Sequence, residues 1–340
     1  MDLVGVSAAL GRGCARRPWV TVTLATLVVC APLFLALADL GTATWYPVLD
    51  LAMTEFRVRD VFGAHTPLIG LPGRIGEFPN QGSHPGPLSF YLLAPLYRLL
   101  GSTSWALEAA TVAIHITAIA TALWIGQRRA GWRGVLGVAA MLAVAIRGYG
   151  QLLLTQPWNP YLPVLAWLVV LLAAWSVLCG DSLMLVPLVI AGSLCAQTHV
   201  PYLVPCAVLM TGALVYATWQ GGRWRVARGR RWLDRNAVVA VVIGLVLWVP
   251  PLVDQLTNDP GNGRTLLDHF GDPPEPVVGL AEGARLALRH FDVWAGFAGF
   301  TGDLDGAGRF VSSADAWRGI LALGAWVIAA VAAWRHEPAA

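Results

Sequence analysis

The sequence predicts an all-α integral membrane protein: a helix bundle of about eight membrane crossings plus one short interfacial or re-entrant helix. Of the 340 residues, 56% are hydrophobic and only 13% are charged, and the mean hydropathy is +0.61. A water-soluble chain of this length rarely shows such a balance. Long apolar runs and arginine clusters between them point the same way, and we expect residues 1–340 to form a single membrane domain.

The apolar runs define the expected crossings, because a helix needs about 20 apolar residues to span the hydrocarbon core of a bilayer. Eight stretches approach this length, two of them short: Trp19–Leu40, Leu107–Gln127, Gly134–Ile146, Tyr161–Cys179, Ser182–Gln197, Tyr202–Trp219, Ala237–Val253 and Trp317–Trp334. The stretch Pro87–Leu100 is apolar but contains Pro95 and Arg98. It fits an interfacial or re-entrant helix as well as a crossing.

Arginine placement predicts the orientation, because basic residues favour the cytoplasmic side. We place the N-terminus, with Arg12, Arg16 and Arg17, in the cytoplasm of a cell whose plasma membrane the chain crosses several times. If Pro87–Leu100 does not cross, the arginines of 128–133 and 223–235 also fall inside. The net charge of +3 is then a topology signal, and we expect membrane lipid rather than nucleic acid as the partner of these clusters.

Two long loops then face outward, a first outer loop at 41–86 and a second at 254–316. Long loops on a membrane scaffold usually carry function. In the first, Leu49–Phe62 has the spacing of a short helix lying along the membrane surface. In the second, Leu280–Ala295 resembles an amphipathic helix.

Asp50 is the candidate catalytic residue. It stands about ten residues beyond the first apolar run, so it can lie at the outer membrane boundary and accept a proton from an acceptor hydroxyl. Arg57, Arg59 and Arg74 are candidates for binding a phosphate, because guanidinium groups bind phosphate oxygens in bidentate fashion. Other roles stay open: Asp50 also suits a solvated helix start, and Arg57 and Arg59 also suit headgroup anchoring or local ion pairing, as between Glu55 and Arg59 four residues apart.

His84, Asn159 and His199 are the remaining candidates for substrate binding, since all three are predicted on the outer side. His84 before Pro85 also fits a simple turn, and Asn159 before Pro160 also fits a helix cap. The motifs of soluble enzymes are missing: there is no phosphate-binding glycine loop, no paired-cysteine zinc pattern and no Gly-x-Ser-x-Gly elbow. We assign no metal ligands, and the cofactor is not evident from the sequence.

Five outward stretches, in this order, resemble the membrane-embedded GT-C glycosyltransferases, in particular the group with protein O-mannosyltransferases and lipid A aminoarabinose transferases. They are Val48-Leu49-Asp50-Leu51-Ala52, Glu55–Val61 with Pro67–Gly70, His84-Pro85-Gly86-Pro87-Leu88 continuing to Ala94, Gln156-Pro157-Trp158-Asn159-Pro160-Tyr161, and Gln197-Thr198-His199-Val200. Together they cover roughly residues 1 to 260.

The resemblance implies a GT-C-like fold and a polyprenyl-phosphate sugar donor, with the sugar passing to a glycan, lipid or protein acceptor on the outer face. In that family the first-loop acid activates the acceptor, and Asp50 matches it. Many members place a second outer acid where this chain has Asn159. Because of this departure, two questions stay open: whether the protein needs a divalent metal, and which type of acceptor it uses.

Two other classes of function stay open. A polytopic transporter or flippase of a lipid-linked or small substrate would use charged residues within the membrane, for which Glu108 and His115 are candidates. A non-catalytic membrane assembly subunit would not need Asp50.

Overall fold

The computed structural model describes residues 18–76, 81–226, 234–273, 278–292, 303–304, 310–311 and 315–336. The chain forms two compact units, residues 1–272 and residues 273–340. The N-terminal arginines and most of the 223–235 cluster lie outside the side chains described. The predicted all-helical character is confirmed for the first unit, where only the isolated bridge between Pro72 and Ser83 departs from helices and loops among the described residues.

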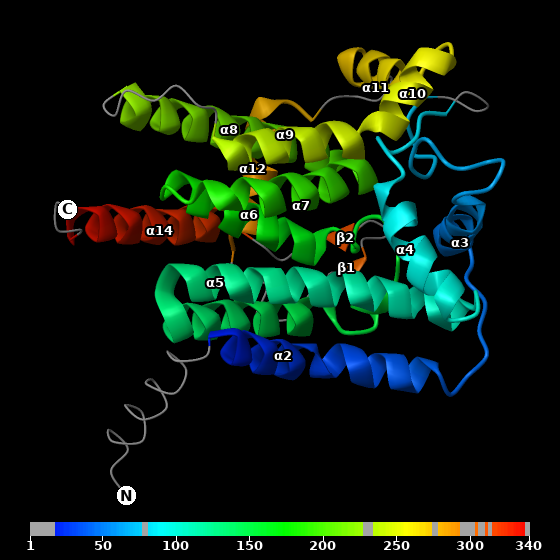
Figure 1. Ribbon diagram of the computed structural model, residues 1–340, viewed down its shortest axis with the longest axis horizontal. Coiled ribbons are helices and arrows are strands. Elements are labelled where there is room, and N and C mark those ends of the chain that lie inside the picture. Colours follow the sequence, from blue (N-terminus) through cyan, green and yellow to red (C-terminus); the bar gives the residue numbers. More distant parts are fainter. Residues whose placement is uncertain are drawn as a thin grey trace, which may run out of the picture. The chain divides into compact units, whose positions relative to one another are not determined.

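The first unit is a bundle of apolar helices with short helices gathered at one end (Figure 1). The bundle helices are α2 (Pro18–Leu40), α5 (Ser104–Tyr149), α6 (Val164–Leu178), α7 (Leu185–Thr198), α8 (Leu203–Val226) and α9 (Arg235–Leu247). The short helices at the end are α3 (Asp50–Asp60), α4 (Leu88–Leu99), α10 (Val249–Thr257) and α11 (Asn262–Gly271). Three single 3₁₀ turns complete it: η1 (Leu153–Thr155), η2 (Ser182–Met184) and η3 (Val200–Tyr202).

Helix α5 is two helices joined by a sharp reversal. Ala130 and Gly131 leave the helical region, and Gly131 has a φ of +59°, which favours glycine. A Cβ on Gly126 would lie 2.8 Å from the carbonyl oxygen of Gly134, so glycine is needed where the two arms meet. The two runs predicted at Leu107–Gln127 and Gly134–Ile146 are therefore the two arms of one helical hairpin.

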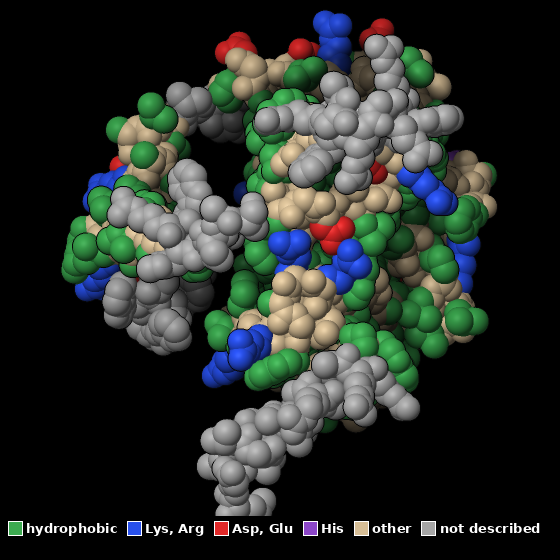
Figure 2. All heavy atoms as spheres, turned by 60° about the vertical axis from the view of Figure 1, so that its left-hand side comes forward, with side chains coloured by type: hydrophobic (Ala, Val, Ile, Leu, Met, Phe, Trp, Pro, Cys, Tyr) green, Lys and Arg blue, Asp and Glu red, His purple; other side chains and the backbone are tan. Residues whose placement is uncertain are grey.

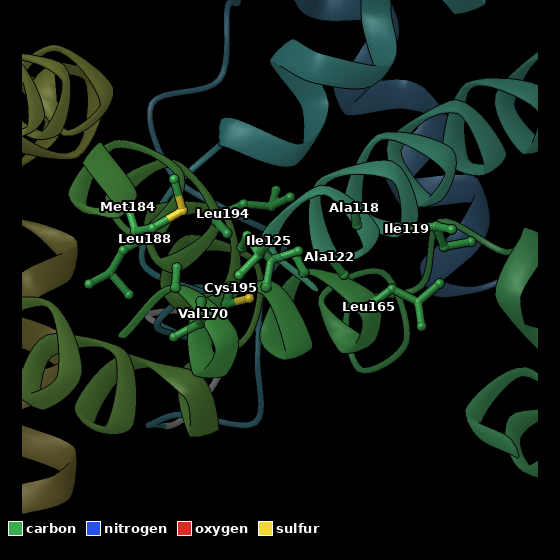
Figure 3. Packing of buried hydrophobic residues seen from close by; sticks show 14 of the residues in the cluster. Ala118, Ile119, Ala122, Ile125, Leu165, Val170, Met184, Leu188, Leu194 and Cys195 are labelled. Carbon is green, nitrogen blue, oxygen red and sulfur yellow. The ribbon is translucent and has the colours of Figure 1, made fainter. Parts of the chain in front are cut away.

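The core of the bundle is aliphatic and tightly packed. Side chains of α5, α6 and α7 meet there, including Ala122, Leu165, Val170, Leu188 and Leu194 (Figure 3). Each is buried, whereas many large apolar side chains on the outside of the same helices are exposed. Apolar side chains on both the inside and the outside of a helix bundle are expected when the surrounding solvent is lipid.

Length and hydropathy support membrane insertion. Among the described residues, α2, α5 and the segment Val200–Gln220 are long and apolar enough to cross a bilayer, and α9 with α10 becomes a fourth span if their 44° bend lies within one crossing. Val164–Leu178, Ser182–Thr198 and Ala316–Ala329 are apolar but shorter. With 12 residues, α4 is about 18 Å long, less than the hydrocarbon thickness, as expected for an interfacial or re-entrant helix.

Arginines gather at the end of the bundle formed by the α5 reversal. Arg128 pairs with Asp181 at 2.7 Å and lies over the ring of Trp124, while Arg129 lies over Trp175. Figure 2 brings this end forward and shows basic side chains beside an acidic one on a largely apolar face. The first arm of α5 separates this end from α3 and α4.

The second unit holds α12 (Leu280–His290), α14 (Ala316–His336) and a short antiparallel ribbon of β1 (Asp303–Leu304) and β2 (Phe310–Val311). Helix α12 packs on α14. The buried carboxylate of Asp292 accepts a hydrogen bond from the backbone N–H of Asp315 at 2.9 Å and lies 3.8 Å from the Arg318 guanidinium.

Candidate functional site

Asp50 begins helix α3, and its carboxylate is exposed. The indole Nε1–H of Trp158 donates a hydrogen bond of 2.9 Å to its Oδ2. The Thr54 hydroxyl donates to the Asp50 carbonyl at 2.8 Å, which secures the first turn of the helix. One carboxylate oxygen is thus held by a side chain 108 residues away, and the rest of the group stays accessible.

The backbone just before Asp50 is strained. Leu49 has a φ of +51°, in the left-handed region that side chains larger than glycine rarely adopt. Such a conformation costs of order 1–3 kcal/mol and persists where the surroundings over-determine it. The Leu49 side chain is itself 82% exposed, so packing of that side chain does not explain the strain. The left-handed backbone at Leu49 turns the chain sharply into α3, directly before the residue that carries the carboxylate.

Trp158 reaches Asp50 from the turn that joins η1 to α6. Its carbonyl accepts hydrogen bonds from the backbone N–H groups of Tyr161 and Leu162, both at 2.9 Å. The Tyr161 ring packs edge-on against the indole, with ring centroids 5.2 Å apart. Asn159, the predicted site residue, is buried on the same turn. The prediction selected Asn159, but Trp158 is the residue of this turn that contacts the carboxylate.

His84 and His199 form a tilted ring pair with centroids 5.1 Å apart. The backbone N–H of Val200 donates to Nδ1 of His84 at 3.3 Å, which places the proton of the neutral ring on Nε2. Burial is the main reason that the pKa of His84 falls to about 4, His199 lowers it further, and the Asp50 carboxylate opposes the change. Burial also lowers the pKa of His199. Both rings are therefore neutral near pH 7, and His84 lies within the electrostatic reach of Asp50.

The turn that carries His84 is fixed by backbone hydrogen bonds on both sides. Gly70 N–H donates to the His84 carbonyl at 2.9 Å, and His84 N–H donates to the Leu71 carbonyl at 2.8 Å. Two residues on, Gly86 N–H donates to the Gln197 carbonyl at 3.1 Å. A Cβ on Gly86 would lie 2.7 Å from Cγ of Gln197, so only glycine allows this approach.

The end of α7 presents unsatisfied polar atoms to this region. Gln197 Oε1, Thr198 Oγ1 and His199 Nδ1 are buried and have no hydrogen-bond partner within the described part of the chain. Buried polar atoms are nearly always paired, so a run of three calls for an explanation such as a polar ligand or water. Gln197 and Thr198 stand in the stretch singled out with His199, but only the structure marks their side chains as unpaired.

The first residues of the loop that follows α9 contact the loop at 41–86 through Asn262, which the sequence singled out only as part of a turn cluster. Its side chain accepts from Ser83 N–H at 2.8 Å and donates to the Ser83 carbonyl at 3.1 Å. The buried Asp254 carboxylate accepts from the backbone N–H of Asn262 at 2.9 Å and from the Asn258 amide at 2.8 Å. The only signal in the sequence is the turn-rich tract from Asn258 to Gly263.

The three predicted phosphate-binding arginines differ in their surroundings. Arg59 pairs with Glu55 at 2.5 Å and donates to the Tyr97 hydroxyl at 2.8 Å, and this network joins α3 to α4. Arg57 is half-buried and Arg74 is exposed, and neither makes a polar contact with any other described residue. Arg57 and Arg74 can therefore bind an anion without breaking a described contact, whereas Arg59 links α3 to α4.

An apolar groove of about 410 Å³ lies among helices α4, α5, α6 and α7. Five alanines line it and leave room for a chain: Ala110, Ala113, Ala118, Ala166 and Ala191. Leu92 and Ile190 also line it and are exposed themselves, so the groove opens on the outside of the bundle. One wall is α4, the helix to which α3 is attached.

Within the described ranges, no group of three or more His, Cys, Asp or Glu side chains could hold a metal ion. Comparisons of this chain with protein-family models, with curated proteins and with solved structures gave no match.

Proposed function

We propose that this protein transfers a sugar from a polyprenyl-phosphate donor to an acceptor on the outer face of the membrane, with Asp50 as the base. The observation that carries the proposal is the accessible Asp50 carboxylate, held by Trp158 beside two neutral histidines and the unpaired polar atoms at the end of α7. A carboxylate fixed at one oxygen and open at the other suits proton abstraction from a hydroxyl.

In the reaction, the acceptor hydroxyl gives its proton to Asp50 while its oxygen attacks the anomeric carbon of the sugar. The bond between that carbon and the phosphate oxygen breaks, and its electron pair leaves with the polyprenyl phosphate. Attack from the side opposite the phosphate inverts the anomeric centre. Arg57 and Arg74 offer unpaired guanidinium groups to the departing phosphate, and neutral His84 and His199 offer hydrogen bonds to the sugar.

The groove among α4 to α7 supports a lipid-linked donor. Its lining is apolar, its volume of about 410 Å³ is in the usual range of ligand pockets, and it opens laterally. A segment of hydrocarbon chain would occupy it from the lipid side, while the phosphate stays near α3. The acceptor would approach from water.

The proposed topology has eight crossings and a cytoplasmic N-terminus in the plasma membrane. Seven would lie in the first unit: α2, the two arms of α5, α6, α7, α8 and α9; α14 would be the eighth. The arrangement is GT-C-like in that the acid follows the first crossing. Clustering of Arg128 and Arg129 at the end away from α3 supports this orientation.

The experiment supplies membranes containing the protein with a panel of radiolabelled polyprenyl-phosphate sugars and follows label leaving the prenyl pool. We expect transfer with wild type and none with a normally folded Asp50→Asn variant. Equal transfer by both would remove Asp50 from catalysis, and transfer by neither across the panel would count against the enzyme.

A transporter of lipid-linked substrates is the second candidate, and one observation favours it. Glu108 Oε2 and both ring nitrogens of His115 are buried within α5 without a partner among the described residues. Buried ionisable groups in membrane helices often mark a transport path. Substrate flux across liposomes that survives Asp50→Asn but is lost in Glu108→Gln would favour the transporter.

A further inference from the structure

Helix α9 exposes an apolar stripe that does not stop where the helix ends. Val238, Val242 and Leu245 are exposed along α9, and Val249, Leu252 and Leu256 continue the alternating spacing of four and three residues along α10. The stripe crosses the 44° bend between the two helices without a break. Along α9, an exposed stripe of valine and leucine is expected to face lipid.

Helix α11, which follows α10, also exposes apolar side chains. Leu267 and Phe270, three residues apart, are 76% and 58% exposed, and Leu256 at the end of α10 is 85% exposed. Arg264 and Asp268 form a neighbouring charged stripe, with side chains about 70% exposed and 3.6 Å between their charged atoms. Two adjacent short helices thus each show an uncovered apolar side.

The opposite side of this helix pair is committed to the protein. Asn262 of α11 is hydrogen-bonded to Ser83, and its own backbone is held by the buried Asp254 of α10. The backbone N–H of Gly76 donates to Nδ1 of His269 at 3.2 Å. The inner side of α10–α11 therefore holds the loop that carries His84 through hydrogen bonds.

We propose that the α10–α11 pair is a membrane-interface latch, with Leu256, Leu267 and Phe270 inserted into the acyl boundary of the leaflet and Asn262 holding the Ser83–His84 turn. The occupant of the apolar side is lipid. The stripe arrives from a lipid-facing helix without interruption, and the charged stripe beside it suits the headgroup layer. Lipid contact on one side then fixes the position of a loop on the other. This inference does not depend on the transferase reaction.

The test places a nitroxide spin label at single cysteines in the full-length protein, reconstituted in phosphatidylcholine–phosphatidylglycerol vesicles. Cys14 and the exposed Cys179 are replaced by serine to remove background labelling. Leu267→Cys and Leu256→Cys probe the apolar side, and Asp268→Cys is the matched control on the same helix. All three side chains are exposed, so labelling should not disturb folding.

We expect labels at 267 and 256 to collide with oxygen, which concentrates in lipid, and to be shielded from a water-soluble nickel chelate. Their ratio of oxygen to nickel accessibility should be several-fold higher than at 268. Equal nickel accessibility at 267 and 268 would overturn the proposal by placing the apolar side in water. Shielding of 267 from both reagents would overturn it as well, because a protein surface, from the second unit or a second copy, would then cover it.

Discussion

The Trp158–Asp50 hydrogen bond gives the sharpest prediction about the site. Trp158→Phe keeps the aromatic packing against Tyr161 but removes the N–H that lies 2.9 Å from Oδ2 of Asp50. A hydrogen bond to a charged group contributes about 1.5–3 kcal/mol when buried, and this one is partly solvated, so about 1 kcal/mol is the appropriate loss. Since 1.4 kcal/mol corresponds to a factor of ten in rate, kcat should fall about fivefold.

The assay is transfer of radiolabelled sugar by purified protein in lipid nanodiscs, with donor concentration varied so that kcat and KM separate. Trp105→Phe is the matched control, because its Nε1–H donates a bond of 2.8 Å to the Leu37 carbonyl and none to Asp50. We expect Trp158→Phe to lower kcat with little change in KM, and Trp105→Phe to leave both unchanged. Equal kcat for Trp158→Phe and wild type, or equal losses in both variants, would refute the positioning role of Trp158.

Three further predictions concern the loop, the turn and the groove. The pKa of His84 is lowered from 6.5 to about 4 in the folded protein. Between pH 7 and pH 5 the unfolded chain therefore binds a proton at this ring that the native state does not bind. The free energy of unfolding should fall by about 2 kcal/mol over this range. Thermal unfolding should show a weaker pH dependence in His84→Gln, and an unchanged one would contradict the assignment. Gly86→Ala should lower the unfolding temperature, because the added Cβ meets Gln197, whereas Gly148→Ala, with open space around it, should not; similar unfolding temperatures would show that the approach is not tight. Ala113→Trp should fill the groove and raise KM for a long-chain donor more than for a short-chain analogue, and equal effects on both would exclude the groove as the tail site.

The helices were largely predictable from the sequence because apolar runs in a membrane protein are long and contiguous. The run at Trp19–Leu40 became α2 (Pro18–Leu40), and the spacing at Leu49–Phe62 became α3 (Asp50–Asp60). The predicted helix Leu280–Ala295 is confirmed from Leu280 to His290; residues 291 and 292 are not helical, and residues 293–295 lie outside the described part. Helix α11 was missed, because its ten residues have mixed polarity and no long apolar period.

The site was predictable only in its parts. Asp50 and His84 stand out as polar residues in a long loop that is predicted to face outward, but their partners come from far along the chain. Trp158 is 108 residues from Asp50, and Asn262 is 179 residues from Ser83. Such pairings depend on how the helices pack, and no local pattern encodes them. The pair between Glu55 and Arg59 could be predicted from their spacing of four residues, whereas the bond from Arg59 to Tyr97 on α4 could not.

The most direct test of the central claim separates donor binding from transfer in one protein. Wild type and Asp50→Asn, purified in nanodiscs, are titrated with a radiolabelled polyprenyl-phosphate sugar to obtain Kd, and acceptor is then added for a single turnover. The asparagine amide keeps an oxygen for the Trp158 N–H but cannot take the acceptor proton. We predict equal Kd for the two proteins and sugar transfer by wild type alone. Transfer by Asp50→Asn at the wild-type rate, or an absence of donor binding in both, would contradict the account.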